Sequence, residues 1–136
     1  MSYSQGNVYR EREVLTASPE KLVVMTFDHV LVNLRRARMA IVAGNIELRA
    51  QSMGKARDGV MELLMSTDTE RGGEIANNLR ALYSFALREF LAIGRSRDVN
   101  QLDRVTAILT DLRNAFATIA DPAVASSAAV ATSPAA

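Results

Sequence analysis

The sequence lacks cysteine and tryptophan, and it has a single histidine, His29, among 136 residues. Without cysteine there is no disulfide framework and no thiolate nucleophile or metal ligand. One histidine cannot supply the paired Glu-x-x-His motifs of a di-iron bundle, and it leaves few ways to assemble a nucleophile with a base. We therefore expect His29 to be a surface or packing residue. The absences predict a protein that is not an enzyme and has no catalytic residue, metal site or cofactor.

An excess of one charge sign is also missing, since 16 basic residues balance 15 acidic ones to give a net charge of +1. Binding to nucleic acid or to an anionic membrane usually requires a clear basic excess on one face. The densest basic cluster is Arg35, Arg36 and Arg38. Because Asp28 and Glu47 lie near it in the sequence, we interpret it as a solvated helix face. We expect no nucleic-acid partner.

Long hydrophobic runs are absent as well. The apolar stretch 22–27 is followed by charge within a few residues, far short of the ~20 residues that cross a bilayer. Residues 1–15 have no apolar core of a secretory signal, and Gly72-Gly73 does not belong to a G-x-x-x-x-G-K phosphate loop. We expect a soluble intracellular protein without membrane insertion.

The clearest positive feature is a helix start at Ser18-Pro19-Glu20. Serine is a good N-cap, proline is tolerated at the first helical position, and the glutamate meets the positive end of the helix dipole. Apolar residues then recur at steps of three and four, which places them on one helix face. They are Val23, Phe27, Val30, Leu34, Ala37 and Ile41. Gly44 is expected to end this helix, and Asn45 to cap the next one.

Three further helices follow. The second is predicted over about 46–65, and either Gly54 or Gly59 is a candidate for a close helix crossing. A connection through Ser66–Asp68 and Gly72-Gly73 leads to the third, which is expected to end at Gly94. Asp98 is expected to cap the fourth, with Gln101 at the capping-box position. The inward residues predicted for these helices are Met53, Ala56, Val60, Leu63 and Leu64; Ile75, Leu79, Leu82, Ala86 and Ile93; and Leu102, Val105, Leu109, Leu112, Phe116 and Ile119.

Helices of similar length joined by short loops predict an all-α, antiparallel up-down four-helix bundle over residues 18–121. Residues 1–17 are predicted to form a short mobile N-terminal arm or cap. Asp121-Pro122 should stop the last helix. Residues 122–136 contain small residues and proline with no charge, so we predict a disordered Ala/Ser/Pro tail.

Several helices carry more large apolar residues than one inward stripe requires. The additional residues are Val24, Leu31 and Val32 in the first helix, Met61 and Met65 in the second, and Tyr83, Phe85, Leu87 and Leu91 in the third. One interpretation is a groove for another helix or peptide, to which flexible, polarizable methionine is suited. The other is a wide core with scattered exposed apolar side chains, which are normal on protein surfaces.

Two segments of the chain form a recognisable pattern. The first segment comprises Tyr9, the run Val14-Leu15-Thr16-Ala17-Ser18-Pro19, Leu22, Met25 and Phe27-Asp28. The second comprises Gly72-Gly73-Glu74-Ile75-Ala76-Asn77-Asn78-Leu79 and Ala81-Leu82-Tyr83. Both segments resemble the FliS family of flagellar export chaperones. Together with the four-helix layout, the resemblance covers about residues 8–120.

The resemblance implies a cytoplasmic chaperone that binds the disordered C-terminal segment of flagellin in apolar grooves. Such binding would prevent premature polymerisation and keep flagellin competent for flagellar type III secretion. The predicted flagellin-binding residues of the groove and cap are Val8, Tyr9, Val24, Leu31, Met61, Met65, Tyr83 and Leu87. Tyr9, with Val8, is the candidate for a mobile cap over empty clefts. Components of the export gate are further candidate partners.

Two other functions remain open at this point. The additional apolar stripe could serve self-association, which predicts a homodimer and a scaffold role. Alternatively, the Arg35–Arg38 cluster could bind nucleic acid, which predicts salt-dependent retention on DNA or RNA.

Overall fold

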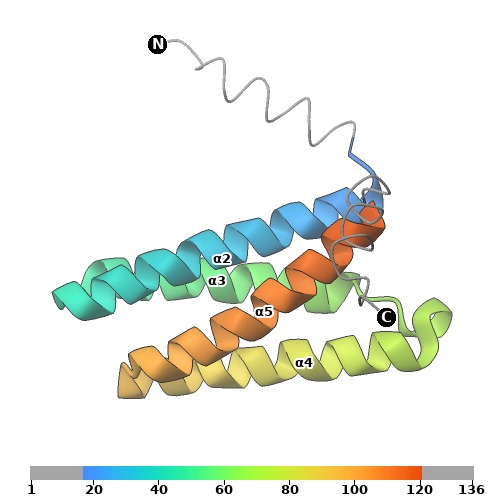
Figure 1. Ribbon diagram of the computed structural model, residues 1–136. Coiled ribbons are helices and arrows are strands. Elements are labelled where there is room, and N and C mark those ends of the chain that lie inside the picture. The colour runs from blue at the N-terminus through green and yellow to red at the C-terminus, as the bar shows by residue number, and fades with distance from the viewer. Residues whose placement is uncertain (1–16, 121–136) are drawn as a thin grey trace, which may run out of the picture.

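The computed structural model describes residues 17–120, which form four helices (Figure 1). They are α2 (Pro19–Ala43), α3 (Ile46–Ser66), α4 (Thr69–Ser96) and α5 (Val99–Ala120). Each helix packs antiparallel to the one before it, and α5 returns to lie along α2, so the predicted all-α four-helix bundle is confirmed. The predicted arm, apart from Ala17, and the predicted tail lie outside the described residues.

The first two helices begin and end where the sequence predicted. The Ser18 hydroxyl accepts a hydrogen bond from the Lys21 backbone N–H at 3.2 Å. Gly44 ends α2 in the left-handed conformation, with φ of 70°, and the Asn45 side chain accepts from the Leu48 N–H at 3.1 Å. These caps satisfy backbone groups that the ends of a helix leave without partners.

The connection between α3 and α4 is shorter than predicted. Asp68 caps α4 by accepting from the Glu70 and Arg71 N–H groups at 3.0 and 3.3 Å, so the helix begins at Thr69. Gly73 then interrupts it with φ of 56° and ψ of −128°. Because glycine has no Cβ, it adopts such a conformation at little steric cost. The two glycines therefore mark a kink within α4 and not a loop before it.

The start of α5 confirms Asp98 as the N-cap and corrects the role of Gln101. The Asp98 carboxylate accepts from the Asn100 and Gln101 N–H groups at 2.9 and 3.2 Å. The Asp98 N–H, however, donates to the Ser96 hydroxyl at 3.1 Å. The Gln101 amide instead donates to the Glu89 carboxylate at 3.0 Å. The Gln101 side chain therefore bonds to α4. In a capping box it would instead have bonded to the N-cap residue of its own helix.

The core agrees with the predicted stripes on α2 and α3 and on the first half of α5. On α4 the predicted stripe is partly wrong, because Ile75 is 73% exposed whereas Tyr83 is 1% exposed. Tyr83 lies seven residues from both Ala76 and Phe90, which is close to two helical turns, so these three residues share the buried face. Val24 and Leu31 on α2 are also buried, although the sequence placed them outside the core.

A close approach of α2 and α3 occurs at Gly59. A Cβ atom at this position would lie 2.5 Å from Cγ2 of the fully buried Val30. At Gly54, one and a half turns earlier, a Cβ atom would meet nothing within 4 Å. Of the two candidate glycines, only Gly59 is required by the helix crossing.

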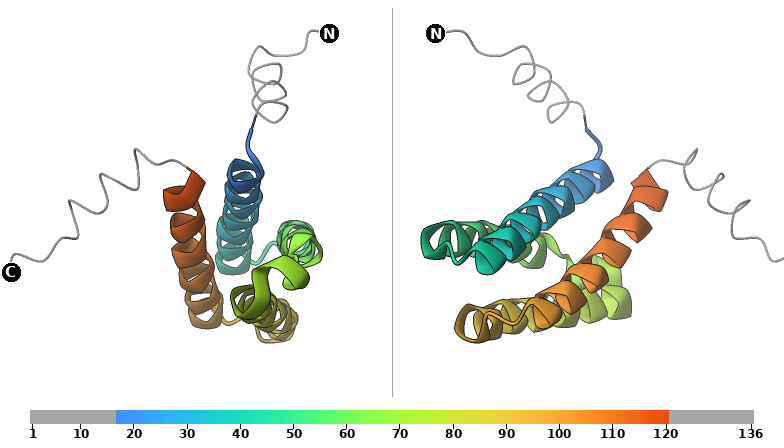
Figure 2. Two further views of the ribbon diagram at one scale, coloured as in Figure 1. Left: turned by 90° about the vertical axis from the view of Figure 1, so that its right-hand side faces the viewer. Right: turned by 60° about the vertical axis from the view of Figure 1, so that its left-hand side comes forward.

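α5 is attached to α2 along most of its length. Arg113 donates to Asp28 at 2.8 Å and Arg38 donates to Asp103 at 2.9 Å, and Phe116 lies against Phe27 with ring centroids 5.6 Å apart. Figures 1 and 2 show the consequence: α4 and α5 meet at their connecting turn and then diverge, so that the end of α5 lies near the start of α2. The N-terminal half of α4 is left with little cover on that side.

The two glycines of α3 give a matched test of the helix crossing. Gly59→Ala should lower the free energy of unfolding by about 1 kcal/mol or more, because overpacking against rigid Val30 costs more than alanine's helix propensity returns. Gly54→Ala should raise it by up to about 1 kcal/mol. Urea unfolding followed by circular dichroism measures both. A stabilising Gly59→Ala would contradict the close crossing.

Candidate protein-binding surface

The structure divides the predicted binding residues into two groups. Met61, Met65 and Leu87 lie at the surface or partly at the surface, next to the contact of α3 with α4. Val24, Leu31 and Tyr83 belong to the buried core, so the expectation that they lie off the inward face is wrong. Val8 and Tyr9 lie outside the described residues.

Tyr83 contacts α2 from the centre of α4. Its ring lies 6.2 Å from that of Phe27, and burial raises the pKa of its phenol to about 12. The side chain is therefore neutral at any physiological pH. An aromatic side chain in this place stabilises the bundle mainly through the apolar area it buries.

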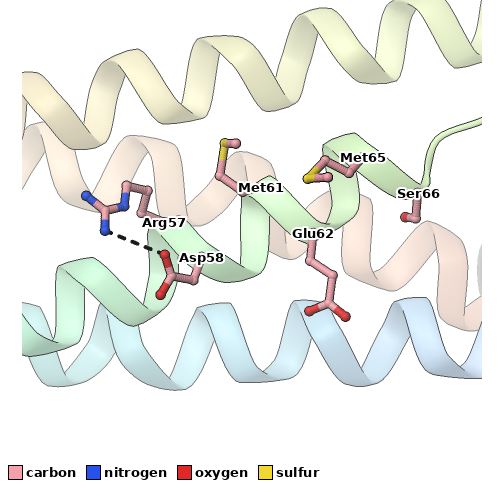
Figure 3. A pocket seen from close by; sticks show the side chains of 6 residues that line it. All are labelled: Arg57, Asp58, Met61, Glu62, Met65 and Ser66. Atoms are coloured by element: carbon pink, nitrogen blue, oxygen red, sulfur yellow. Dashed lines mark ion pairs between the residues drawn. The ribbon is translucent and has the colours of Figure 1, made fainter.

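The first surface, which we call the α3–α4 face, is formed by Met61, Met65, Leu87 and Leu91. Met61 and Met65 are 40% and 78% exposed, and Figure 3 shows both pointing from α3 toward α4. They line an open depression of about 710 Å³ together with Arg57, Asp58, Glu62 and Ser66. Its lining combines two methionine side chains with charged ones, and sites for apolar segments likewise combine apolar and polar groups.

Leu87 and Leu91 join this face from the α4 side. The Arg80 guanidinium donates to the backbone carbonyl of Leu64 at 3.0 Å, which identifies the flank of α4 that faces α3. Leu87 follows Arg80 by seven residues and Leu91 by eleven, so both lie on the same flank. Leu91 is exposed and Leu87 is partly buried. Aliphatic and thioether side chains from two helices therefore form one adaptable surface.

The second surface, which we call the α4–α5 face, is formed by Ile75, Leu82, Phe85 and Ile119. All four are exposed. Apolar side chains of this size are rarely exposed together in one region of a soluble bundle. The hydrogen bond between Gln101 and Glu89 identifies the flanks of α5 and α4 that face each other. Leu82 and Ile75 precede Glu89 by two and four turns, and Ile119 follows Gln101 by five turns.

The sequence pattern did not predict the α4–α5 face, because Ile75, Leu82 and Ile119 fit an inward stripe. Periodicity identifies residues that share a helix face, but it does not show whether a neighbouring helix covers that face. Here α5 diverges from α4 (Figure 2), and Ile75, Leu82 and Ile119 are exposed. The sequence did contain one indication that α4 has exposed apolar surface: Phe85 and Leu91 are apolar and lie on either side of that stripe.

Arg57 and Asp58, which line the depression of the α3–α4 face, form an exposed ion pair (Figure 3). Within residues 17–120, no three His, Cys, Asp or Glu side chains are placed to hold a metal ion. The two charged groups with a shifted pKa lie in the α2–α5 contact. The hydrogen bond from Arg38 lowers the pKa of Asp103, and the same bond raises the pKa of Arg38. The described helices also include none that is both long and apolar enough to cross a membrane. The arrangement is suited to binding an apolar segment.

Comparison with known proteins gives one family. The family model described as flagellar protein FliS matches residues 1–123. The chain is 32% identical to the flagellar secretion chaperone FliS of Salmonella typhimurium over 123 residues, which is 90% of each chain. It is 34% identical to that of Escherichia coli over 116 residues, covering 85% of this chain and 84% of the relative. It is 31% identical to the flagellar secretion chaperone FliSB of Pseudomonas aeruginosa over 114 residues, covering 84% and 89%.

Alanine substitutions at Tyr83 and Ile75 should distinguish core from surface on α4. Tyr83→Ala should lower the free energy of unfolding by about 3–5 kcal/mol, because it leaves a cavity against Phe27. Ile75→Ala should change it by no more than about 0.5 kcal/mol, because little apolar area is lost at an exposed position. Equal losses in urea unfolding would show that the assignment of these two residues is wrong.

Proposed function

Because the chain belongs to the FliS family of flagellar secretion chaperones, we propose that it binds the disordered C-terminal segment of flagellin along the α3–α4 and α4–α5 faces. Members of this family are chaperones and not enzymes. The observation that carries the proposal is the uncovered apolar surface on both flanks of α4. Under this proposal the protein acts in the cytoplasm.

The binding surface is apolar where an amphipathic segment would lie. Met65 and Leu91 on one flank, and Ile75 and Ile119 on the other, are each more than three-fifths exposed. Covering these side chains removes apolar area from water at about 25 cal/mol per Å². A disordered segment that becomes helical in such a place binds as a helix in a groove. The surface thus supplies the free energy needed to order the client.

The same energetics explain how a chaperone of this kind can work without ATP. Ordering a disordered segment costs roughly 2–5 kcal/mol or more, offset by burial of about 1,000–3,000 Å². While the segment is bound, its apolar residues cannot pair with another flagellin, so polymerisation is prevented. The rest of the client remains unfolded enough for type III secretion. Release leaves the bundle unchanged and ready for another client.

We place Val8 and Tyr9 in this scheme as a cap that covers the apolar faces when no client is bound. Ser18 and Pro19 begin α2 directly after the arm, which gives the arm a fixed origin at the end of the bundle where α2 starts and α5 finishes. The start of α2 lies at the same end of the bundle as the start of α4 (Figure 1). Export-gate components remain candidate partners of the loaded chaperone.

The central prediction is a one-to-one complex with the flagellin of the same bacterium. Size exclusion of the two purified proteins at micromolar concentration should show comigration, and circular dichroism should show a gain in helix content on mixing. Deletion of the flagellin C-terminal segment should abolish both. The proposal fails if intact flagellin does not comigrate.

Substitutions at the exposed Leu82 and the partly buried Leu87 should locate the binding faces. Leu82→Glu on the α4–α5 face and Leu87→Glu on the α3–α4 face should each weaken flagellin binding by at least about tenfold, because a carboxylate is placed in an apolar contact. Val32→Glu is the matched control, since Val32 is about as exposed as Leu82 but lies on α2. Isothermal titration calorimetry gives the affinities. An equal loss for Val32→Glu would mean that the faces are wrongly assigned.

The two rival functions make different predictions in the same assays. A self-associating scaffold would sediment as a stable homodimer and gain no helix on adding flagellin. A nucleic-acid-binding bundle would be retained on DNA or RNA in a salt-dependent way and would not respond to Leu82→Glu. The uncovered apolar flanks of α4 favour the flagellin complex over the second rival, since phosphate contacts do not require them.

A further inference from the structure

Basic and acidic residues are distributed unevenly along the length of the bundle, although their total numbers are nearly equal. Residues 35–55 and 88–105 form one end, and Figure 1 shows both the α2–α3 and the α4–α5 turns there. We call this region the turn end. It has nine arginine and lysine side chains against four carboxylates, whereas the rest of the described chain has five against eight. The basic surface that the net charge of +1 appeared to exclude is therefore present locally.

Most of the basic side chains at the turn end face solvent without a carboxylate partner. Arg36, Arg95 and Arg97 are exposed. Among the ion pairs within residues 17–120, only that of Arg38 with Asp103 involves a basic residue of this end. Two further carboxylates of the turn end are already acceptors, one in the N-cap of α5 and one in the Glu89–Gln101 bond. A positive field therefore extends from this end into the solvent.

Exposed aliphatic side chains lie among these arginines. Met39, Val42 and Ile46 are 63%, 71% and 66% exposed, and the last two flank the Gly44-Asn45 turn. A small cleft of about 120 Å³ lies between the two turns and is lined in part by Ile46, Arg49 and Arg97. The tip of the bundle thus combines cationic and apolar side chains at one place. This surface is separate from the α4–α5 face, because the N-terminal part of α4 lies at the other end of the bundle.

We propose that the turn end docks peripherally on the surface of an anionic phospholipid bilayer. The arginines would lie over lipid phosphates, where each basic side chain adds attraction, and Val42 and Ile46 would enter the interface between headgroups and acyl chains. No helix crosses the bilayer in this arrangement. Nucleic acid fits less well, because the one aromatic residue of the turn end, Phe90, is buried and cannot stack on a base.

The position of the turn end leaves the α4–α5 face free during docking. α2 starts and α5 finishes at the opposite end of the bundle (Figure 2), where the proposed cap originates. A chaperone held at the membrane by its turns would direct that end away from the lipid. The N-terminal half of α4 and the α4–α5 face would then remain accessible to the export machinery.

Flotation of the full-length protein with vesicles tests the proposal. Vesicles of phosphatidylcholine with about 30% phosphatidylglycerol should bind it at about 0.05 M salt, and the binding should fall at least about tenfold at about 0.5 M salt. Vesicles of phosphatidylcholine alone should not bind it. Absence of binding to the anionic vesicles at low salt overturns the proposal without using any variant.

Two matched double variants test the location. Arg95→Glu with Arg97→Asn lowers the charge of the turn end by three and should reduce vesicle binding at least about tenfold; asparagine suits the left-handed conformation of residue 97, whose φ is 55°. Arg71→Glu with Lys21→Asn makes the same charge change at the other end and should leave binding within about twofold. Equal losses in the two variants would overturn the assignment to the turn end.

The aliphatic tip distinguishes lipid from nucleic acid. Val42→Asn with Ile46→Asn should reduce vesicle binding at least about fivefold, because the side chains that enter the interface lose their apolar character. Retention on DNA that is stronger than binding to vesicles, and that this variant does not change, would overturn the lipid assignment. Both aliphatic positions are exposed, and circular dichroism of each variant shows whether the fold is retained.

Discussion

The placement of α5 along α2 is the constraint on which the binding surfaces depend. The Arg113–Asp28 pair and the contact between the tilted rings of Phe116 and Phe27 hold the C-terminal half of α5 against α2. Exposed ion pairs contribute little to stability on their own, so the aromatic contact and the surrounding core supply most of the attachment. A helix held in this direction cannot also cover the start of α4. The uncovered flank of α4 follows from where α5 is attached.

The close approach of α2 to α3 also helps to leave part of α4 uncovered. Gly59 lets α3 lie directly against Val30, so these two helices form a compact pair to which α4 and α5 are added. α4 then has apolar residues over more of its circumference than its neighbours occupy. Tyr83 and Phe90 fill the inward face, and the remaining apolar side chains form the α3–α4 and α4–α5 faces. Exposed apolar surface of this kind is an aggregation hazard unless a partner covers it, which is the role proposed here for the client.

Much of the fold could be predicted from local chemistry. Ser18, Gly44, Asn45 and Asp98 act as caps because their side chains or backbone freedom satisfy helix ends without help from the rest of the protein. The stripes of α2 and α3 were predictable because neighbouring helices cover most of each stripe. On α4, two overlapping stripes have the same three-and-four spacing, one through Ile75 and Leu82 and the other through Ala76, Tyr83 and Phe90. Which one is buried depends on the tilt of α5, and a periodic pattern carries no information about tilt. The charge separation was likewise hidden, because helices distant in sequence meet at the turn end.

Methionine oxidation offers the most direct test that a client covers the flanks of α4. Met61 and Met65 on the α3–α4 face and Met39 at the turn end are all exposed, so a peroxide oxidises each of them in the free protein. With saturating flagellin, mass spectrometry should show sulfoxide formation at Met61 and Met65 slowed at least about fivefold, while Met39 reacts as before. Unchanged oxidation of Met61 and Met65 in a complex that has formed, or equal protection of all three, would contradict client binding at α4.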